Sequence, residues 1–262
     1  MVRIFFFCVL TVFVLSACSS APPLTLTPTS TQAVVPNPSA TSTAPVPASP
    51  QPTQFFPTVP PHPTLDPNFF RDEFIETLDA QWNWAREDSE NWSLASVPGS
   101  LQINVGNGYV VAHNYSNLLL RPAPEGNFQI ETQVAFDPRH NFEFAGLIIY
   151  ETDSNFIQAG HGFCSSVDCI GEGLYMNSYL KGSAIKPGPM QTYTYRDPVF
   201  LRLSRRRNTY TFENSQNGDV WFLIGTQTIA IEPLQIGLVG SQNLRGDILP
   251  AKFGYFEVRS LP

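Results

Sequence analysis

The sequence predicts an all-β protein in which two antiparallel sheets pack face to face as a sandwich. Twelve short runs rich in β-branched and aromatic residues, separated by turn residues, follow one another between residues 100 and 258. No stretch of this region places apolar residues at the spacing of a helix face. Residues 65–262 have the size of one sandwich domain, so we expect a single domain there.

The expected strands are the runs 100–105, 108–113, 117–121, 128–136, 143–151, 156–162, 173–182, 199–205, 209–214, 220–225, 234–240 and 252–258. The run 173–182 shows most clearly the alternation of a strand with two different faces. One face carries Leu174, Met176, Ser178 and Leu180, and the other carries Tyr175, Asn177, Tyr179 and Lys181.

Residues 1–17 have the features of a secretory signal peptide. Arg3 precedes an uncharged apolar run, 4–15, which is shorter than the roughly 20 residues that a membrane-spanning helix needs. The sequence LSAC that ends at Cys18 resembles the lipobox of bacterial lipoproteins. The resemblance implies cleavage before Cys18, lipidation of Cys18 and firm membrane anchoring by several acyl chains. We expect an exported lipoprotein on the cell surface or in the periplasm; an uncleaved membrane helix is the alternative.

Residues 18–64 predict a disordered linker between this anchor and the domain. They contain no Asp, Glu, Lys or Arg and are rich in Pro, Thr, Ser and Ala, a composition that cannot bury a core. The whole chain has a formal net charge of −7 at pH 7. An acidic protein is a poor partner for nucleic acid, because nucleic-acid-binding proteins gather Lys and Arg. We expect no nucleic-acid partner and a monomer.

Three stretches, 70–103, 142–160 and 199–225, carry a resemblance to a known family. The first combines Asp72-x-Phe74 with Trp-x-Trp, Trp-Ser-Leu and Pro-Gly-x-Leu, and the second has an Ala-Gly-Leu strand before an acidic turn. The third has Leu-Arg-x-x-Arg before a turn and Trp221. Together they resemble the concanavalin A-like sandwich that follows the catalytic propeller of family 43 β-xylosidases. Domain of unknown function 1349, a free-standing version, is equally similar. The resemblance covers 70–258 and implies a concanavalin A-like jelly roll.

In those xylosidases the propeller carries the chemistry, so the resemblance implies a domain without a catalyst. The nearest match to the paired glutamates of jelly-roll glucanases, Glu151-x-Asp153-x-x-Phe156, ends in a residue that can neither protonate nor attack a sugar. Glu131 and Glu172 are expected to be isolated, solvated acids. We expect no enzymatic activity; an active site without a known motif is the alternative.

The outward row of Tyr175, Asn177 and Tyr179 is the candidate carbohydrate-binding site. Aromatic rings stack on the apolar faces of sugars, and amides and Arg satisfy sugar hydroxyls. Gln158 and Arg202 flank this row if their strands are neighbours in the same sheet. The alternative is that the tyrosines cover a sheet face, because aromatic residues are common in strands.

The stretch 215–225 has two interpretations, an Asp-box loop of a propeller or a β-hairpin. The motif occurs once and lies between two alternating runs, so we interpret it as a hairpin. Asn217-Gly218 then forms a two-residue type I′ turn, and Trp221 packs as a strand residue. The arginines 205–207 are expected in a solvated turn. Trp82, Trp84 and Trp92 are expected in core or edge packing.

Cys164 and Cys169 predict a disulfide, because an exported protein permits one and a Gly-rich turn separates them. A metal site that includes His161 is the alternative, but it lacks a fourth ligand. His62, His113 and His140 show no metal spacing either. Related sandwiches hold a structural calcium between an acid of the first strand and one of the last strand. Gly254 stands at the second place, so Asp72 and Glu73 lack that partner, and we expect no metal and no cofactor.

The sequence therefore predicts a lipid-anchored protein whose sandwich binds carbohydrate without cleaving it. Two alternatives remain open, a structural or protein-interaction module of the cell envelope and an unrecognised glycoside hydrolase.

Overall fold

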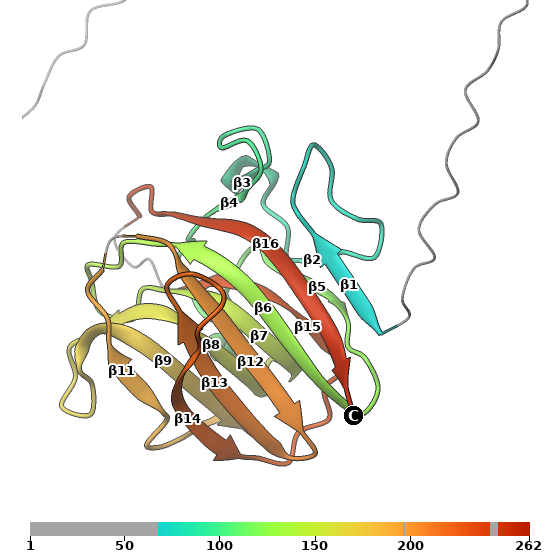
Figure 1. Ribbon diagram of the computed structural model, residues 1–262. Coiled ribbons are helices and arrows are strands. Elements are labelled where there is room, and N and C mark those ends of the chain that lie inside the picture. The colour runs from blue at the N-terminus through green and yellow to red at the C-terminus, as the bar shows by residue number, and fades with distance from the viewer. Residues whose placement is uncertain (1–67, 196, 242–245) are drawn as a thin grey trace, which may run out of the picture. The chain divides into compact units, whose positions relative to one another are not determined.

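A computed structural model describes residues 68–195, 197–241 and 246–262. The predicted signal peptide 1–17, Cys18 and the predicted linker 18–64 lie outside these residues. Within the described residues, sixteen strands form two antiparallel sheets that pack as a sandwich (Figure 1), and two short 3₁₀ helices lie between strands; this confirms the predicted fold class. No helix in the described part of the chain is long and apolar enough to cross a membrane.

The first sheet has the strand order β14-β13-β12-β6-β16-β4-β3, and β1 pairs with the other half of β16. Its strands are β14 (Phe222–Thr228), β13 (Thr209–Ser215), β12 (Val199–Arg206), β6 (Asn127–Ala135), β16 (Pro250–Leu261), β4 (Leu101–Asn104), β3 (Trp92–Ser93) and β1 (Phe69–Asp72).

The second sheet has the order β10-β9-β8-β7-β15-β5-β2, and β11 pairs with the other half of β9. Its strands are β10 (Ser183–Ile185), β9 (Gly171–Leu180), β8 (Asn155–Cys164), β7 (Phe144–Thr152), β15 (Gln235–Ser241), β5 (Leu118–Pro122), β2 (Asn83–Ala85) and β11 (Met190–Thr192).

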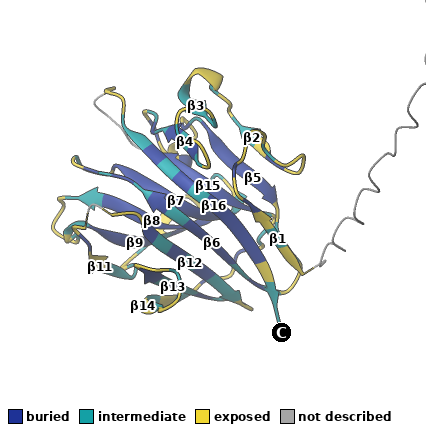
Figure 2. Cartoon of the chain, turned by 45° about the horizontal axis from the view of Figure 1, so that its top comes forward, coloured by how far each residue is buried: buried dark blue, intermediate teal, exposed yellow. Residues whose placement is uncertain are grey.

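The main core lies between the two sheets and follows from the alternation of the strands. Leu174 and Met176 of β9 reach it from one side, and Leu201 and Leu203 of β12 reach it from the other. All four are completely buried, and burial of one such side chain contributes about 1.5–3 kcal/mol. The strand centres are accordingly buried, and the exposed residues gather in the loops (Figure 2). Tyr175, Asn177 and Tyr179 therefore point away from this core.

A second, smaller core lies on the outer face of the second sheet. Val110 and Tyr115 pack there against residues of β7, β8, β9, β5 and β15. The predicted strand 108–113 is wrong, because this segment instead forms the 3₁₀ helix η2 (Val110–Ala112). Gly108 at φ 107° and His113 at φ 57° turn the chain before and after η2, so it cannot continue as a strand.

The first loop is built around Trp82, which is 8% exposed and meets Phe256 edge-on at a centroid distance of 4.9 Å. Trp84 and Trp92 lie 4.9 Å apart and pack against the main core. All three tryptophans thus occupy core or edge positions, as expected. Asp72 organises this loop by accepting hydrogen bonds from three N–H groups, those of the Trp82 ring and of the Phe74 and Asp79 backbones.

The stretch 215–225 forms a hairpin, because β13 and β14 pair antiparallel, but the predicted turn is wrong. Residues 216–221 form a longer loop, in which only Gly218 has a positive φ. The Asn217 side chain accepts from the backbone N–H groups of Asp219 and Val220 and so fixes this loop without a type I′ turn. Trp221 precedes the strand and lies over the Arg202 guanidinium at 3.6 Å.

The arginines 205–207 lie at the end of the β12–β13 hairpin. Arg206 and Arg207 are exposed, as expected for a turn. Arg205 is partly buried and donates to the backbone carbonyl of Gly126. The arginines therefore stabilise the β12–β13 hairpin and connect it to the neighbouring turn at Gly126.

Candidate functional site

A pocket of about 420 Å³ opens on the outer face of the second sheet, where β8 and β9 form its floor. Asn177 of β9 lies directly opposite Gln158 of β8, and both side chains line the pocket together with Tyr175 and Tyr179. The structure therefore brings together four of the five residues that the sequence predicted for carbohydrate binding. The volume lies within the range of small-molecule binding sites, about 300–1,000 Å³.

The two amides are the polar groups of the pocket floor. Gln158 is 8% exposed and Asn177 is half-buried. Neither side chain forms a hydrogen bond with another residue in the part of the chain that the structure describes. The polar atoms of both amides are accessible to solvent, so a ligand can replace the water that they bind. The two amides therefore suit a ligand that carries hydroxyl groups.

The two tyrosines differ in what they offer. Tyr175 is 5% exposed, and its hydroxyl donates to the Gly171 carbonyl at 2.5 Å and accepts from the Ile170 N–H at 3.3 Å. Burial raises the pKa of Tyr175. Tyr179 stacks on Phe156, with ring centroids 4.6 Å apart, so one face of its ring is covered. Tyr175 thus supports the floor and an adjacent loop, while Tyr179 keeps one ring face toward the pocket.

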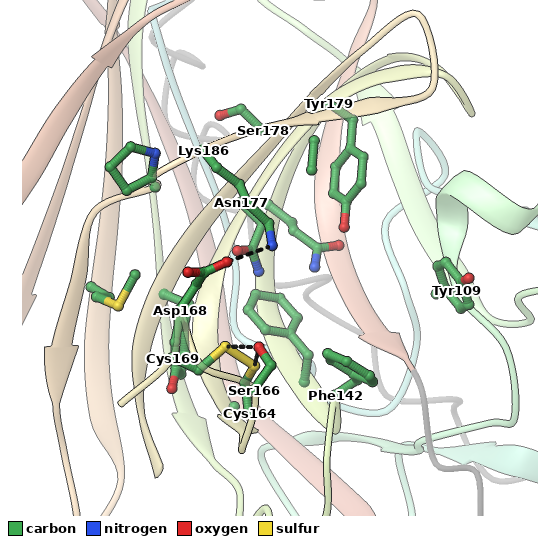
Figure 3. A pocket seen from close by; sticks show the side chains of 18 of the residues that line it. Tyr109, Phe142, Cys164, Ser166, Asp168, Cys169, Asn177, Ser178, Tyr179 and Lys186 are labelled. Atoms are coloured by element: carbon green, nitrogen blue, oxygen red, sulfur yellow. Dashed lines mark hydrogen bonds and ion pairs between the residues drawn. A yellow bond between two sulfur atoms is a disulfide. The ribbon is translucent and has the colours of Figure 1, made fainter. Parts of the chain in front are cut away.

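Two loops form walls on one side of this floor. Cys164 and Cys169 form a disulfide that closes the loop after β8. Lys186 belongs to the connection between β10 and β11, and its ammonium lies 3.4 Å from the carboxylate of Asp168 in the disulfide loop. Figure 3 shows this ion pair across the edge of the pocket, with the disulfide beside it. The ion pair, whose two side chains are each 64% exposed, links these two walls across 18 residues of sequence.

Two exposed aromatic rings stand on another side of the pocket. Tyr109 is 36% exposed and Phe142 is 42% exposed, and Figure 3 places both away from the Lys186–Asp168 pair. The sequence interpretation missed both residues. Tyr109 was assigned to a strand that does not form. Phe142 lies in the β6–β7 loop, where an apolar ring among polar residues is the one signal that could have indicated it.

Arg202, the fifth predicted residue, is not part of this pocket, and its assignment is wrong. It lies on β12 of the first sheet, opposite Glu131 of β6 and Glu213 of β13. Its Nε atom donates to Glu131 Oε1 at 2.9 Å. Arg202 could flank the tyrosine row only if its strand lay in the same sheet as β9. The structure places β12 and β9 in different sheets.

A second cavity of about 290 Å³ lies on the outer face of the first sheet, around this ion pair. Glu257 of β16 lies opposite Glu131 and accepts hydrogen bonds from Arg71 at 2.9 Å and Arg259 at 2.5 Å. Burial acts to raise the pKa of Glu257, but the bonds from Arg259 and Arg71 outweigh it and lower the pKa. Burial raises the pKa of Glu131 in spite of Arg202. The arginines and glutamates of this cavity thus satisfy one another.

The two acids expected to be solvated and isolated are neither. Glu131 is 8% exposed and bonds to Arg202 and Gln129. Glu172 lies with its carboxylate 3.3 Å from the buried ring of His161. Burial between the strands, which sequence spacing does not reveal, accounts for both differences. Each acid is held by a neighbouring side chain.

The stretch 151–156 forms the hairpin turn between β7 and β8, as the sequence indicated. Asp153 accepts hydrogen bonds from the hydroxyls of Tyr115 at 2.9 Å and Tyr150 at 2.8 Å, and His113 Nδ1 lies 2.6 Å away. Burial opposes ionisation of Asp153, but these bonds outweigh it and lower its pKa. This carboxylate holds the segment around η2 against the second sheet.

Among the described residues, no three His, Cys, Asp or Glu side chains lie close enough together to hold a metal ion. Asp72, the acid considered for calcium, already accepts three N–H donors. Glu73 pairs with Arg71 at 2.6 Å. An added Cβ at Gly254 would lie 2.7 Å from Gln133 Oε1, the end of a flexible side chain that can move aside.

Comparison with known proteins identifies the family to which this sandwich is similar. Residues 71–259 match the family described as the beta-xylosidase C-terminal concanavalin A-like domain. A xylan 1,3-beta-xylosidase of a Vibrio species is 28% identical over 185 residues, which are 64% of this chain and 31% of that protein. A non-reducing end alpha-L-arabinofuranosidase of Bacteroides ovatus is 25% identical over 222 residues, 80% of this chain and 41% of that protein. This chain therefore spans less than half the length of these two relatives.

Solved structures show the same fold. A GH43 protein of Bacillus licheniformis superposes with a TM-score of 0.64 at 19% identity, over 75% of this chain and 40% of that one. A xylan beta-1,4-xylosidase of Bacillus halodurans gives a TM-score of 0.62 at 22% identity, over 78% and 41% of the two chains. The family match covers nearly all of the described sandwich. The chain belongs to the family of beta-xylosidase C-terminal concanavalin A-like domains.

Proposed function

We propose that this protein binds a carbohydrate in the pocket on the second sheet and does not cleave it. One observation carries the proposal: the pocket combines aromatic walls with two side-chain amides, Gln158 and Asn177, that have no partner among the described residues. Sugars present apolar faces and hydroxyl groups together, and this combination of rings and amides complements both. The second cavity also has amides, but those of Gln129 and Asn217 already bond to other residues.

The relatives suggest which sugars to try first. Their names specify xylan and non-reducing-end arabinofuranose as what those proteins act on. This chain matches only part of each, so their activities belong to those whole proteins. We propose neutral pentose glycans, xylan and arabinan, as the first ligands to test.

The absence of cleavage is part of the proposal. Glycoside hydrolysis uses two carboxyl groups, about 5–5.5 Å apart with retention or about 6.5–9.5 Å apart with inversion; one donates a proton and the other attacks the sugar or activates water. The two acids that line the pocket are Glu143 and Asp168. Glu143 accepts from the Arg139 and His140 backbones and His140 ring, and Asp168 pairs with Lys186. Both acids are thus held by other groups.

Removing the two amides should weaken binding. We expect Asn177→Ala and Gln158→Ala each to lower the affinity for a bound pentose oligosaccharide about five- to tenfold, the value of one or two hydrogen bonds to a neutral ligand. Isothermal titration of the full chain measures this. Asn83→Ala, which removes an exposed amide on β2, is the matched control and should bind like the wild type. Unchanged affinity in both pocket variants would contradict the proposed site.

We also propose that the protein is exported and anchored through a lipid on Cys18. The support is the LSAC sequence after a short apolar run, together with the uncharged stretch 18–64 that follows. Cys18→Ser removes the thiol that carries the lipid, so we expect this variant to leave the membrane fraction. Fractionation followed by immunoblotting measures the change. Retention of Cys18→Ser in the membrane would instead support an uncleaved helix.

A further inference from the structure

We propose that the pocket receives the end of a neutral glycan chain, and that Phe142 and Tyr109 at its mouth contact the sugar ring that follows. This inference rests on the proposed function and specifies the ligand of the same site. Four observations carry it: the enclosure of the pocket, the fixed exposure of Phe142, the anchoring of Tyr109 and the charges that line the walls.

Loops bound the pocket on one side of its floor, which limits the path open to a glycan chain. The Lys186–Asp168 ion pair joins the β10–β11 connection to the disulfide loop on one side. Gly188 passes close to β9, since an added Cβ there would lie 2.3 Å from the Met176 carbonyl oxygen. This connection therefore lies directly against the floor strand. A volume of about 420 Å³ is in the lower half of the range for ligand pockets, which suits a chain end better than an internal segment.

Phe142 is held in an exposed position by a rigid loop. Its backbone has φ 72°, a left-handed conformation that is strained for a bulky residue. The loop keeps this conformation because the Phe142 N–H donates to the Phe163 carbonyl at 2.6 Å. Next to it, the buried Glu143 carboxylate accepts from the backbone N–H groups of Arg139 at 2.6 Å and His140 at 2.9 Å. An apolar ring fixed at 42% exposure beside a pocket is suited to a ligand contact.

Tyr109 is fixed by a different segment. Its N–H donates to the side chain of Asn114 at 3.0 Å, and the next residue, Val110, is 1% exposed in the second core. The Tyr109 ring remains 36% exposed at the pocket. Two aromatic rings from separate loops, both fixed before a ligand arrives, lower the conformational entropy that binding costs.

The charges that line the pocket select against acidic sugars. Glu143 and Asp168 are acids, and Lys186, which pairs with Asp168, is the only basic residue among the described lining residues. A uronic acid would bring a further negative charge toward two carboxylates, which costs free energy in a partly buried site. A neutral sugar brings no such cost.

Two titration series of the full chain test the inference. In the first, neutral xylose and arabinose oligomers from monosaccharide to hexasaccharide are compared with oligomers that end in a uronic acid. We expect the affinity to stop rising at the disaccharide or trisaccharide and to be lower for the uronic acid ends. In the second, Phe142→Ala and Tyr109→Ala should each lower the affinity for the trisaccharide about tenfold.

The controls separate this inference from the proposed function. Phe222→Ala removes a ring that is 57% exposed, does not line the pocket and lies on the edge strand β14 of the other sheet, so this variant should bind like the wild type. Affinity that keeps rising to the hexasaccharide, or that is unchanged in Phe142→Ala and Tyr109→Ala, would overturn the inference while the proposed function stands. No binding of any oligomer by protein with an unchanged melting temperature would overturn both.

Discussion

Replacement of Arg202 by Ala should destabilise the protein by about 3 kcal/mol, because it leaves the Glu131 carboxylate buried without its ionic partner. Glu131 is 8% exposed, and its main charged donor is Arg202 Nε at 2.9 Å. Glu257, a second acid, lies directly opposite it on β16. The substitution also removes the cation that lies over the Trp221 ring at 3.6 Å. Denaturant unfolding of the wild type and the variant measures the difference.

A double variant distinguishes this explanation from simple loss of packing. Arg202→Ala combined with Glu131→Gln removes the uncompensated charge, so it should recover most of the stability. Arg207→Ala, which changes an exposed residue in the adjacent turn, should have little effect. A loss below about 1 kcal/mol for Arg202→Ala, the range of exposed ion pairs, would show that the pair is solvated. Glycan affinity should not change, since Arg202 lies on the other sheet.

Replacement of Asp72 by Ala should also cost about 3 kcal/mol or more. Its carboxylate accepts from the Phe74 N–H at 2.8 Å, the Asp79 N–H at 3.2 Å and the Trp82 ring N–H at 2.8 Å. Hydrogen bonds to a charged acceptor contribute about 1.5–3 kcal/mol, and buried donors left without a partner add to the loss. Phe74 and Trp82 belong to the main core, so the damage reaches the packing between the sheets.

A graded series tests the role of this carboxylate. Asp72→Asn keeps one acceptor oxygen and should lose less stability than Asp72→Ala. Glu125→Ala, at an exposed position, should be close to the wild type. Equal unfolding midpoints for Asp72→Ala and Glu125→Ala would contradict the account of the first loop. Addition of calcium should leave the midpoint of the wild type unchanged, because N–H donors occupy the Asp72 oxygens.

The fold could be predicted from the sequence because strands such as β4, β12 and β13 alternate between buried and partly exposed residues. Leu174 and Met176 of β9 enter the core, and Tyr175 and Tyr179 point outward, as the pattern indicated. The prediction was poorest where the backbone leaves the strand pattern. Val110 is buried like a strand residue, but it lies in η2 and packs on the outer face of the second sheet. Apolar periodicity does not distinguish these two forms of burial.

The residues of the site could be predicted only in part. Some follow from the alternation of a single strand, whereas others depend on the order of strands in a sheet or on the placement of loops. Asn177 was identified from the alternation of one strand, and Gln158 proved to be its neighbour across β8 and β9. Arg202 required the order of strands in each sheet, which local sequence does not contain. Phe142 and Tyr109 lie in loops, where placement depends on long-range contacts such as the bond from Phe142 to Phe163.

A crystal structure of the full chain with a neutral pentose oligosaccharide tests the central claim most directly. The account predicts electron density for the sugar between β8, β9 and the disulfide loop, with Asn177 and Gln158 within hydrogen-bonding distance of its hydroxyl groups. Sugar bound instead at the arginine-lined cavity of the first sheet would contradict this account. So would a pocket that stays empty at oligosaccharide concentrations that saturate the protein in solution.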